Sequence, residues 1–413
     1  MRVALLSIGD ELLFGEIVDT NAAFMASRFY DAGASVSRHL TVGDAPADIA
    51  GAIADLLLHS DIIVATGGLG PTEDDCTAEG AALAAGVFLE SNPQALALTR
   101  DFFLRRGVPM HPANAKQAEL PAGAEIIPNP NGTASGFKLK IGGASLYFLP
   151  GVPDEMASMF SATVLPVVLA ATFGVTGTVT RVLKVFGLSE PKSEEAVRSS
   201  VSARAGLRIA YCVNFPEVQV KLRATAADFT SATAMVEEAC AEARTGLADH
   251  LFAEGADTME SVVARLLRER HATISLAESC TGGLIAKRLT DLPGSSDYFL
   301  ESVVSYSNES KTSLIGVPEG LIADLGAVSG AVAEKMAEGV RRLAGSTLSL
   351  AVTGIAGPAG GTNEKPVGTV FVALADGDGT EVKEFRFAGS RDRIRTITCF
   401  AALDMLRRRL LRR

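Results

Sequence analysis

The chain has 413 residues, of which 47% are hydrophobic and 21% are charged, and its 38 Lys and Arg against 48 Asp and Glu give a formal net charge of −10. The length predicts two or three domains, the composition excludes a mainly disordered chain, and the acidic balance argues against a dedicated nucleic-acid-binding protein. Five Cys without a CxxC pair and five scattered His exclude a disulfide framework and a zinc site.

Short apolar runs alternate with helical patterns over residues 1–170, the first predicted domain. The predicted strands each end in a turn that contains glycine, and they lie at 3–8, 61–66 and 145–149. The predicted helices lie at 21–31, with Thr20 as the expected N-cap, at 75–85, and from 153 onward. This alternation is typical of a parallel sheet with helices on both faces, whose ligands bind at the carboxyl ends of the strands.

Residues 171–255 form the second predicted domain, a small α+β unit. Its predicted strands and helices lie at 178–186, 190–201, 218–224 and 232–250. Convergent polar groups, which a functional site needs, are not evident in this segment. We interpret it as a spacer or a dimerisation element.

Residues 256–413 form the third predicted domain, again of the α/β class. An amphipathic helix is predicted at 259–270 and a strand at 273–277, followed by a helix that reaches 292. The remaining predicted strands and the last helix lie at 348–353, 367–374, 381–387 and 392–411. The chain as a whole is therefore predicted to be an α/β multidomain protein.

The densest chemical signal in the first domain is the segment GGLGPTEDDCT at 67–77. Glycines allow backbone N–H groups to approach a phosphate closely, and the following helix adds a positive N-terminal dipole. The adjacent Asp74 and Asp75 suit a hard cation such as Mg²⁺, and Asp10 and Glu11 form a second acidic pair at the same sheet edge. A tight turn with acidic capping residues is the structural alternative. Neither a Walker A loop nor a GxGxxG fingerprint is present.

Four motifs occur here in a fixed order, namely SIGDELL at 7–13, TGGLGPTEDD at 66–75, GTASGF at 132–137 and LPGVPDEM at 149–156. Together they resemble the molybdopterin-binding type of domain at the head of the CinA family, a MoaB/MogA-like sandwich. The resemblance implies metal-dependent hydrolysis of ADP-ribose to AMP and ribose 5-phosphate. It assigns a divalent metal, Mg²⁺ or similar, to Asp10, Asp74 and Asp75, and the substrate to Gly9, Asn21, Gly67, Gly68, Gly70, Gly132, Thr133, Pro150 and Gly151. Glu73 stands where a basic residue is expected in many relatives, so a phosphate contact there would be lost.

In the third domain, Ser279 follows a buried strand and is predicted to open a helix, where a nucleophilic hydroxyl gains from the helix dipole. Lys311 is a candidate base, because a lysine in a dry pocket loses its proton, and Tyr306 is a candidate proton relay. No Ser–His–Asp set is available among the scattered histidines. The structural alternatives are an N-cap for Ser279 and a plain surface lysine for Lys311. The residues expected to leave the helix N-terminus free to face an anion are Thr281, Gly282 and Gly283.

A second ordered set of motifs closely resembles the carboxy-terminal domain of the CinA family, a nicotinamide mononucleotide (NMN) deamidase. The motifs are AESCTGG at 277–283, LPGSS at 292–296, YSNESK at 306–311, GAVS at 326–329, TGIAGPAGG at 353–361, KPVGTV at 365–370 and RDR at 391–393. The resemblance implies attack of Ser279 on the carboxamide carbon, with Lys311 taking its proton and Tyr306 between them or at the leaving ammonia. Backbone N–H groups near Cys280 and Thr281 would stabilise the oxyanion, and no cofactor is needed. The ribose phosphate is assigned to Thr353, Gly354, Gly357 and Arg393.

The two resemblances cover nearly the whole chain in the family's domain order, which makes the middle domain KH-like. The expected partners are NMN and ADP-ribose as small molecules and a second copy of the chain in a homodimer, with no dedicated nucleic-acid binding. No apolar run reaches the length of a membrane span and no signal-peptide pattern is present, so we expect a cytoplasmic protein without a membrane partner.

Two alternatives remain open. Cys280 could act as a thiol nucleophile in place of Ser279. The chain could also be a competence- or damage-associated binding protein, whose first domain holds a molybdopterin-like ligand without turnover. In either case a net charge of −10 gives no long-range attraction for anionic nucleotides. Their phosphates must therefore be held by local groups.

Overall fold

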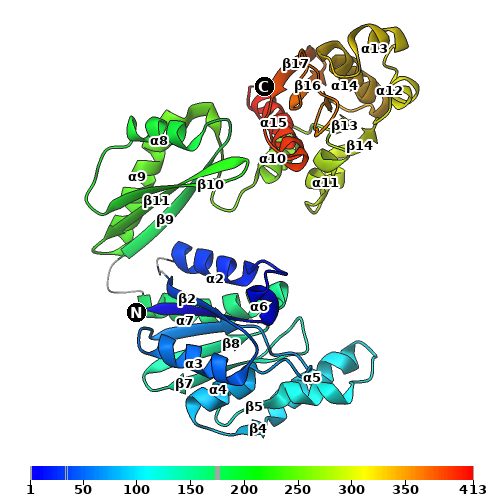
Figure 1. Cartoon of the computed structure of the whole chain (residues 1–413). Helices are drawn as coiled ribbons and strands as arrows, with labels where there is room; N and C mark the ends of the chain where they lie inside the picture. The colour runs from blue at the N-terminus through cyan, green and yellow to red at the C-terminus, as the bar shows by residue number, and fades with distance from the viewer. Residues whose placement is uncertain (1, 33, 35, 173–176, 413) are drawn as a thin grey trace. The chain divides into compact units, whose positions relative to one another are not determined.

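The computed structural model describes residues 2–32, 34, 36–172 and 177–412. These residues divide into two compact units, whose helices and strands are labelled in Figure 1. Unit 1 contains residues 1–180 with 204–208 and 223–237, and unit 2 contains residues 181–203, 209–222 and 238–413. The predicted start of the second domain at 171 adjoins residues 173–176, which lie outside the described residues.

Unit 1 is built on a six-stranded sheet. The strand order is β2 (Val36–Val42), β1 (Val3–Ile8), β3 (Ile62–Thr66), β8 (Ala144–Leu149), β7 (Gly136–Ile141) and β6 (Glu125–Ile127). The first four strands are parallel, as predicted. β7 and β6 run antiparallel to their neighbours, because the short connection from β7 to β8 allows only a hairpin. β4 (Leu89–Ser91) and β5 (Glu119–Pro121) form a separate antiparallel pair.

Helices cover both faces of this sheet, as the sequence predicts. One face packs against α2 (Thr20–Asp31), α6 (Pro153–Met159), η2 (Phe160–Val164) and α7 (Leu165–Thr172). The other packs against α3 (Pro46–Leu57), α4 (Thr77–Ala85) and α5 (Pro93–Arg105). Alternate residues of each strand enter the two cores, so that Val3 and Leu5 face one core and Ala4 and Leu6 the other. All strand positions in β1 and β3 are therefore buried.

Two predicted helix starts need correction. α2 is capped by Asp19, whose carboxylate accepts a hydrogen bond from the Ala22 amide at 2.9 Å, and Thr20 is already helical. α4 begins at Thr77 rather than at residue 75. At α2 two capping residue types, Asp19 and Thr20, stand side by side, and the course of the backbone selects Asp19. The N-cap of α4 is Cys76, whose side chain makes no capping hydrogen bond.

A four-stranded sheet follows, in the order β10 (Leu207–Asn214), β11 (Glu217–Ala226), β9 (Gly177–Val185) and β12 (Leu251–Glu254). α8 (Glu190–Arg198), α9 (Phe229–Leu247) and the short η3 (Ala248–His250) complete an α+β arrangement. β10 and β12 were not predicted. β10 is an edge strand with most positions exposed, so it lacks the apolar run by which a strand is recognised.

Unit 2 contains a five-stranded sheet in the order β14 (Phe299–Val304), β13 (Ile274–Glu278), β15 (Leu348–Gly354), β16 (Thr369–Asp376) and β17 (Gly379–Arg386). β13 is parallel to both of its neighbours, whereas β16 and β17 are antiparallel. The carboxyl ends of β14, β13 and β15 therefore meet at one edge. This is the edge at which the sequence places Ser279 and the loop that begins at Thr353.

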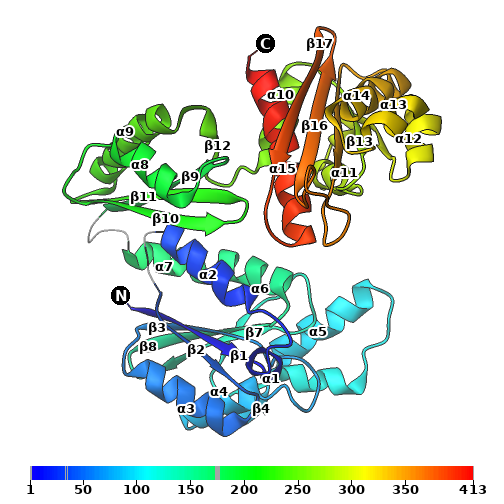
Figure 2. The same cartoon turned by 45° about the horizontal axis from the view of Figure 1, so that its top comes forward.

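Two helical layers enclose this sheet (Figure 2). α10 (Met259–Glu269), α11 (Leu284–Thr290) and α15 (Arg391–Leu411) pack on one face. α12 (Asn308–Ile315), α13 (Glu319–Leu325) and α14 (Gly330–Ala344) pack on the other. β14 and α12 to α14 were not predicted, although the apolar spacing of Val332, Met336 and Val340 could have revealed α14. Among the helices described, none is both long and apolar enough to cross a membrane.

Candidate functional site

Ser279 and Lys311 meet at the carboxyl end of β13. The Ser279 amide donates to the Val352 carbonyl of β15 at 3.0 Å, which fixes the residue directly beyond the strand. Lys311 lies in the first turn of α12, and its Nζ is 3.3 Å from the Ser279 Oγ. Lys311 is only 1% exposed and Ser279 only 9%. The surface-lysine interpretation of Lys311 is therefore excluded, and the structure forms a buried hydroxyl–amine pair.

The environment of Lys311 prepares it for proton transfer. Its Nζ donates to the carbonyls of Ser305 at 2.8 Å, Tyr306 at 3.3 Å and Ser307 at 3.5 Å. These carbonyls orient the amine toward Ser279. Burial lowers the pKa of Lys311, an effect that the neighbouring Cys280 thiol opposes only in part. A lysine with a lowered pKa is able to act as a general base near neutral pH.

The segment from Ser279 to Gly283 is a turn, and α11 begins only at Leu284. The prediction that Ser279 opens the helix is therefore wrong. Gly282 and Gly283 both have positive φ, at 61° and 90°, which reverses the chain between strand and helix. Ser279 consequently stands at the strand end, before the turn, rather than at the cap of α11.

Glu278 is a buried neighbour of Ser279 for which the sequence predicted no role, although it lies in the motif AESCTGG. It is fully buried, and its carboxylate accepts from the amides of Gly283 at 3.0 Å, Ile285 at 3.2 Å and Ala286 at 2.8 Å. The N-terminus of α11 is thus occupied by an internal anion. This differs from the prediction that Gly283 and its neighbours leave the N-terminus free for a substrate anion. The signal that could have found it is an acidic residue closing an otherwise apolar strand.

The backbone after Ser279 offers donors for an oxyanion. Within the part of the chain that the structure describes, neither the Cys280 nor the Thr281 amide donates to a backbone carbonyl. Arg395 of α15 holds the turn by donating to the Thr281 carbonyl at 2.7 Å. The Thr281 hydroxyl is buried and has no hydrogen-bond partner among the described residues. An unpaired buried hydroxyl is costly, so a ligand that pairs with it would gain free energy here.

Cys280 is not prepared to be the nucleophile. It is buried, and burial raises the pKa of its thiol to about 12. The thiol is therefore protonated at neutral pH, whereas the attacking form of cysteine is the thiolate. This observation favours Ser279 over its neighbour.

The Tyr306 backbone carbonyl contacts Lys311, but the Tyr306 side chain is largely exposed. Its phenol oxygen accepts from Arg391 at 2.9 Å, and the residue is 59% exposed. Arg391 also donates to the Gly357 carbonyl at 2.8 Å, so it links Tyr306 to the loop that follows β15. Among the described residues, no hydrogen bond joins the phenol to Ser279 or Lys311. A relay role for Tyr306 therefore stays a prediction.

The residues predicted to hold the ribose phosphate are spread along this edge. The Thr353 hydroxyl donates to the Ala327 carbonyl at 2.8 Å, and Gly354 ends β15. The Arg393 guanidinium lies over the ring of Phe215, 3.8 Å from its centroid. Arg391 is thus the arginine that contacts both Tyr306 and the Gly357 loop, and sequence proximity alone did not distinguish it from Arg393.

In unit 1 the glycine turns gather at the carboxyl ends of β1, β3 and β8, as predicted. The Gly67 amide donates to the Leu149 carbonyl at 3.1 Å and the Gly9 amide to the Val42 carbonyl at 3.0 Å. The Asn21 side chain donates to the Gly151 carbonyl at 2.7 Å, which brings α2 to the same edge, next to Pro150. The side-chain carbonyl oxygen of Asn21, its Oδ1, is buried and has no partner among the described residues.

Asp75 closes the glycine loop from within. Its carboxylate accepts from the Gly70 amide at 2.7 Å, the Thr72 amide at 2.9 Å and the Thr72 hydroxyl. The Thr77 hydroxyl adds a bond to the Gly67 carbonyl at 2.8 Å. The loop around Gly68 is therefore ordered by its own side chains. The Gly70 amide, which was predicted to face a phosphate, already has an anionic partner.

The loop at 129–136 is ordered in a similar way. The Asn129 side-chain oxygen Oδ1 accepts from the Gly132 backbone amide at 2.9 Å, and the Asn129 Nδ2 donates to the Glu155 carboxylate at 2.6 Å. The Thr133 hydroxyl accepts from Gln117 at 3.1 Å. Gly132 and Thr133 thus lie beside the glycine loop, although the Gly132 amide is not free.

The acidic residues predicted to bind a metal divide into two kinds. Asp75 is committed to the glycine loop, whereas Asp74 is exposed. Asp10 pairs with Asp44, whose carboxylate accepts from the Asp10 amide at 3.0 Å. Burial raises the pKa of Asp44, and the carboxylates of Asp10, Glu11 and Asp74 raise it further. Such mutual repulsion is what a divalent cation relieves.

Of the three carboxylates predicted to bind Mg²⁺, two are placed where they could do so together with water and substrate. Within the described residues, no group of three or more His, Cys, Asp or Glu side chains is arranged to hold one ion. Mg²⁺ is commonly bound by one or two carboxylates, with water and substrate phosphate oxygens completing its shell. Asp10 and Asp74 could serve in that way, while Asp75 as placed could not do so without opening the loop.

Family models match the chain in three consecutive parts. Residues 4–170 match a probable molybdopterin binding domain, residues 180–253 match the damage-inducible protein CinA KH domain, and residues 256–410 match the CinA C-terminal domain. A crystal structure of the competence/damage inducible protein CihA from Agrobacterium tumefaciens is 39% identical, covering 36% of this chain and 93% of that chain with a TM-score of 0.35. The protein CinA from Thermoplasma acidophilum is 36% identical, covering 40% and 97% with a TM-score of 0.38.

Full-length relatives are similar over all three parts. A CinA-like protein from Geobacter metallireducens is 55% identical over 411 residues, covering 100% of both chains. A CinA-like protein from Dictyoglomus turgidum is 41% identical over 411 residues, again covering 100% of both. The chain therefore belongs to the CinA family, with its molybdopterin-binding-type, KH and carboxy-terminal domains in that order.

Proposed function

We propose that the protein is a bifunctional hydrolase that deamidates NMN in unit 2 and hydrolyses ADP-ribose in unit 1. The observation that carries the first activity is the buried pair in which the Lys311 Nζ lies 3.3 Å from the Ser279 Oγ. A buried lysine beside a serine hydroxyl is an arrangement for nucleophilic catalysis. It has little structural value, because burial of a lysine amine costs stability.

Deamidation would begin when the neutral Lys311 amine takes the Ser279 proton as the hydroxyl oxygen attacks the carboxamide carbon of NMN. The tetrahedral intermediate then expels the nitrogen as ammonia, which receives the proton held by Lys311. Water then attacks the resulting ester while Lys311 accepts its proton, and Lys311 returns that proton to the Ser279 oxygen as nicotinic acid mononucleotide leaves. The net reaction consumes one water and releases one ammonia.

Backbone amides would stabilise the negative charge that develops on the substrate carbonyl oxygen in these reaction steps. The amides of Cys280 and Thr281 lie directly after the nucleophile and donate to no backbone carbonyl in the described part of the chain. One such donor contributes typically about 3–4 kcal/mol to transition-state stabilisation. Arg395 keeps the turn in place through the Thr281 carbonyl. Tyr306, held by Arg391, would relay the proton from Lys311 to the departing nitrogen or contact the substrate at its exposed side.

The decisive experiment measures ammonia release from NMN. Ser279→Ala should reduce the rate by at least about a thousandfold, because it removes the group that forms the covalent bond. The matched control is Ser313→Ala, an exposed serine of α12 whose hydroxyl bonds within its own helix. Ammonia release by Ser279→Ala at the control's rate would refute the assignment of the nucleophile.

The proposed activity of unit 1 uses the edge formed by Asp10, Asp74 and the glycine loop. A divalent metal bound there would neutralise phosphate charge and activate water. The chain's own part is to orient the substrate against the ends of β1, β3 and β8. The clustered carboxylates around Asp44, whose pKa is raised, support a cation at this edge.

A second candidate function for unit 1 is favoured by its match to a probable molybdopterin binding domain. In that case the same edge would hold a molybdopterin-like ligand without turnover. Incubation of the full chain with ADP-ribose and Mg²⁺ separates the two, because only the hydrolase releases AMP and ribose 5-phosphate. Absence of both products would favour the binding protein.

A further inference from the structure

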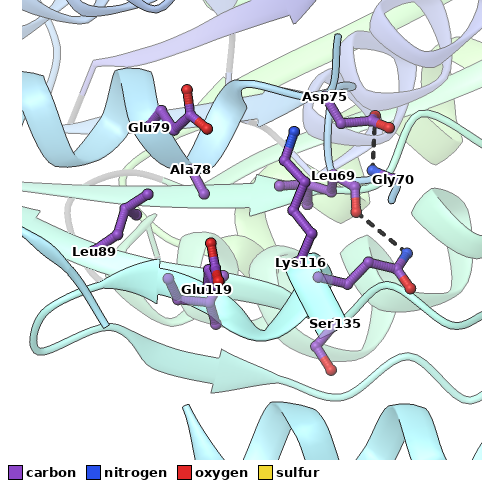
Figure 3. Close-up of a pocket in the computed structure, with 12 residues that line it drawn as sticks. Leu69, Gly70, Asp75, Ala78, Glu79, Leu89, Lys116, Glu119 and Ser135 are labelled. Carbon is purple, nitrogen blue, oxygen red and sulfur yellow. Dashed lines mark hydrogen bonds between the residues drawn. The ribbon is translucent and has the colours of Figure 1, made fainter. Parts of the chain in front are cut away.

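A pocket lies below the glycine loop of unit 1 (Figure 3). Its walls come from the loop itself, from α4 and from η1 (Pro112–Ala118). The polar and glycine residues of its lining include Gly68, Gly70, Asp75, Lys116, Gln117 and Ser135. We call this cavity the loop pocket. Figure 3 shows the ammonium end of Lys116 on the side of the pocket where Asp75 and Gly70 lie.

The loop pocket cannot receive an anion in the way that glycine loops usually do. Asp75 already accepts from the amides of Gly70 and Thr72, so those donors face a carboxylate. Glu79 and Glu119 add further negative charge to the lining. A phosphate that enters the pocket therefore needs a positively charged partner.

Lys116 is the one cationic side chain among the described residues that line the loop pocket. Its Nζ donates to the Thr72 carbonyl at 2.6 Å and lies 3.4 Å from the Glu73 carbonyl. An ammonium group has three N–H donors, so these contacts leave at least one for a ligand.

The neighbour of Lys116 fixes the position of the backbone that carries it. The buried Gln117 side chain donates to the Leu69 carbonyl at 3.4 Å and to the Thr133 hydroxyl at 3.1 Å. The Asn114 side chain in turn donates to the Gln117 oxygen at 3.1 Å. η1 is therefore bonded to both loops at the ligand edge. Lys116 projects from a rigid support, which reduces the entropy lost when it binds a ligand.

We infer that Lys116 is the anion-binding residue of unit 1, and that it contacts a phosphate of a pyrophosphate-containing nucleotide. The identity of the nucleotide rests on the proposed ADP-ribose hydrolysis. The binding of an anion by Lys116 does not depend on that proposal. Glu73, Asp74 and Asp75 make the loop strongly acidic, and Lys116 compensates for that charge from a distant part of the sequence. A phosphate at the remaining N–H donor of Lys116 would add a charged partner to its two carbonyl partners.

The test uses the full chain and inorganic pyrophosphate with Mg²⁺ in titration calorimetry. Lys116→Gln should weaken binding by about tenfold, a typical loss for one charge-assisted contact. Glutamine keeps an N–H donor for the Thr72 carbonyl, so the loop retains its support and the thermal midpoint should not move. Lys116→Arg should restore most of the affinity. Lys140→Gln, at an exposed lysine of β7, is the matched control and should bind like the parent chain.

Ionic strength provides a readout that a purely structural role would not affect. The affinity of the parent chain should fall more steeply with added salt than that of Lys116→Gln, because only the parent chain has this charge contact. Equal affinity of Lys116→Gln and the parent chain, or no pyrophosphate binding by the parent chain, would overturn the inference. Lys116-dependent binding without any hydrolysis of ADP-ribose would instead refute the proposed activity and leave the inference standing.

Discussion

Burial of Lys311 lowers the stability of the fold but gives the amine the property that a catalytic base needs. A buried amine loses hydration, and the three carbonyls around it recover only part of that loss. The lowered pKa of Lys311 is the measurable consequence, and it is the property that a base requires. Cys280, which is buried next to Ser279, responds to the same environment in the opposite way, because burial raises the pKa of an acid, here to about 12.

The pH dependence of ammonia release follows from the direction of the Lys311 shift. Only the neutral amine accepts a proton, so kcat/KM for NMN should rise with pH and reach a plateau. The apparent pKa of that rise should lie below 10.5, the ordinary value for lysine. Lys311→Arg should be inactive at every pH, because a guanidinium does not deprotonate in this range. A rate that falls as the pH rises, or that rises with an apparent pKa of 10.5 or more, would contradict the assignment of Lys311 as the base.

The turns after β3 and β13 are ordered in the same way, by a carboxylate that accepts hydrogen bonds from backbone amides. In each, a glycine-rich turn follows a buried strand, and an internal carboxylate takes the amides that the turn exposes. Asp75 does so for the turn after β3, and Glu278 for the turn after β13. These carboxylates order the turns in the absence of ligand. Substrate anions must therefore be bound by other groups.

Removal of the Glu278 charge should loosen α11. Glu278→Gln keeps the shape of the side chain but replaces one acceptor oxygen with an N–H₂ group that faces amides. We expect a local loss of about 2 kcal/mol, as for a charge-assisted hydrogen bond, which corresponds to about 30-fold faster hydrogen exchange of the Gly283, Ile285 and Ala286 amides. Glu269→Gln, at the exposed end of α10, is the control and should leave this exchange unchanged. Unchanged protection in Glu278→Gln would show that packing alone holds the turn.

The chain contains two candidate sites, one in each of its two compact units. The Ser279–Lys311 pair lies in unit 2, and the glycine loop with Lys116 lies in unit 1. Both take anionic substrates in the proposed function, although the chain carries a net charge of −10. Local cations and backbone donors therefore decide binding, whereas the long-range field does not assist it.

The two activities should be separable by substitution. Ser279→Ala should abolish ammonia release from NMN and leave ADP-ribose hydrolysis intact, because no residue of the pair belongs to unit 1. Asp74→Asn should do the reverse, with a reduction of at least about tenfold in AMP formation if the carboxylate holds the metal. Both products are measured on the same preparations. Loss of both activities in either variant would show that the sites are coupled or that the fold is damaged, and circular dichroism would distinguish these outcomes.

Much of the fold could be predicted because its signals are local. β1, β3, β8, β13 and β15 are apolar runs that end in turns with glycine, and each lies within a residue or two of its predicted bounds. Elements without such a signal were missed. β14 has partly exposed positions at the edge of its sheet, and its pattern resembles that of a loop until its neighbour is known.

The fold class, the family and the residue types at each turn can be inferred from the sequence, because apolar periodicity and motif order are properties of consecutive positions. Which of those residues meet depends on the folded chain. Folding brings Lys311, which is 32 positions away in sequence, next to Ser279, and it places Lys116 at the loop that contains Gly70. It also places the carboxylates of Asp75 and Glu278 where they accept from backbone amides. Such pairings depend on strand register and burial. Both arise from contacts between segments that are distant in sequence, so no local sequence pattern predicts them.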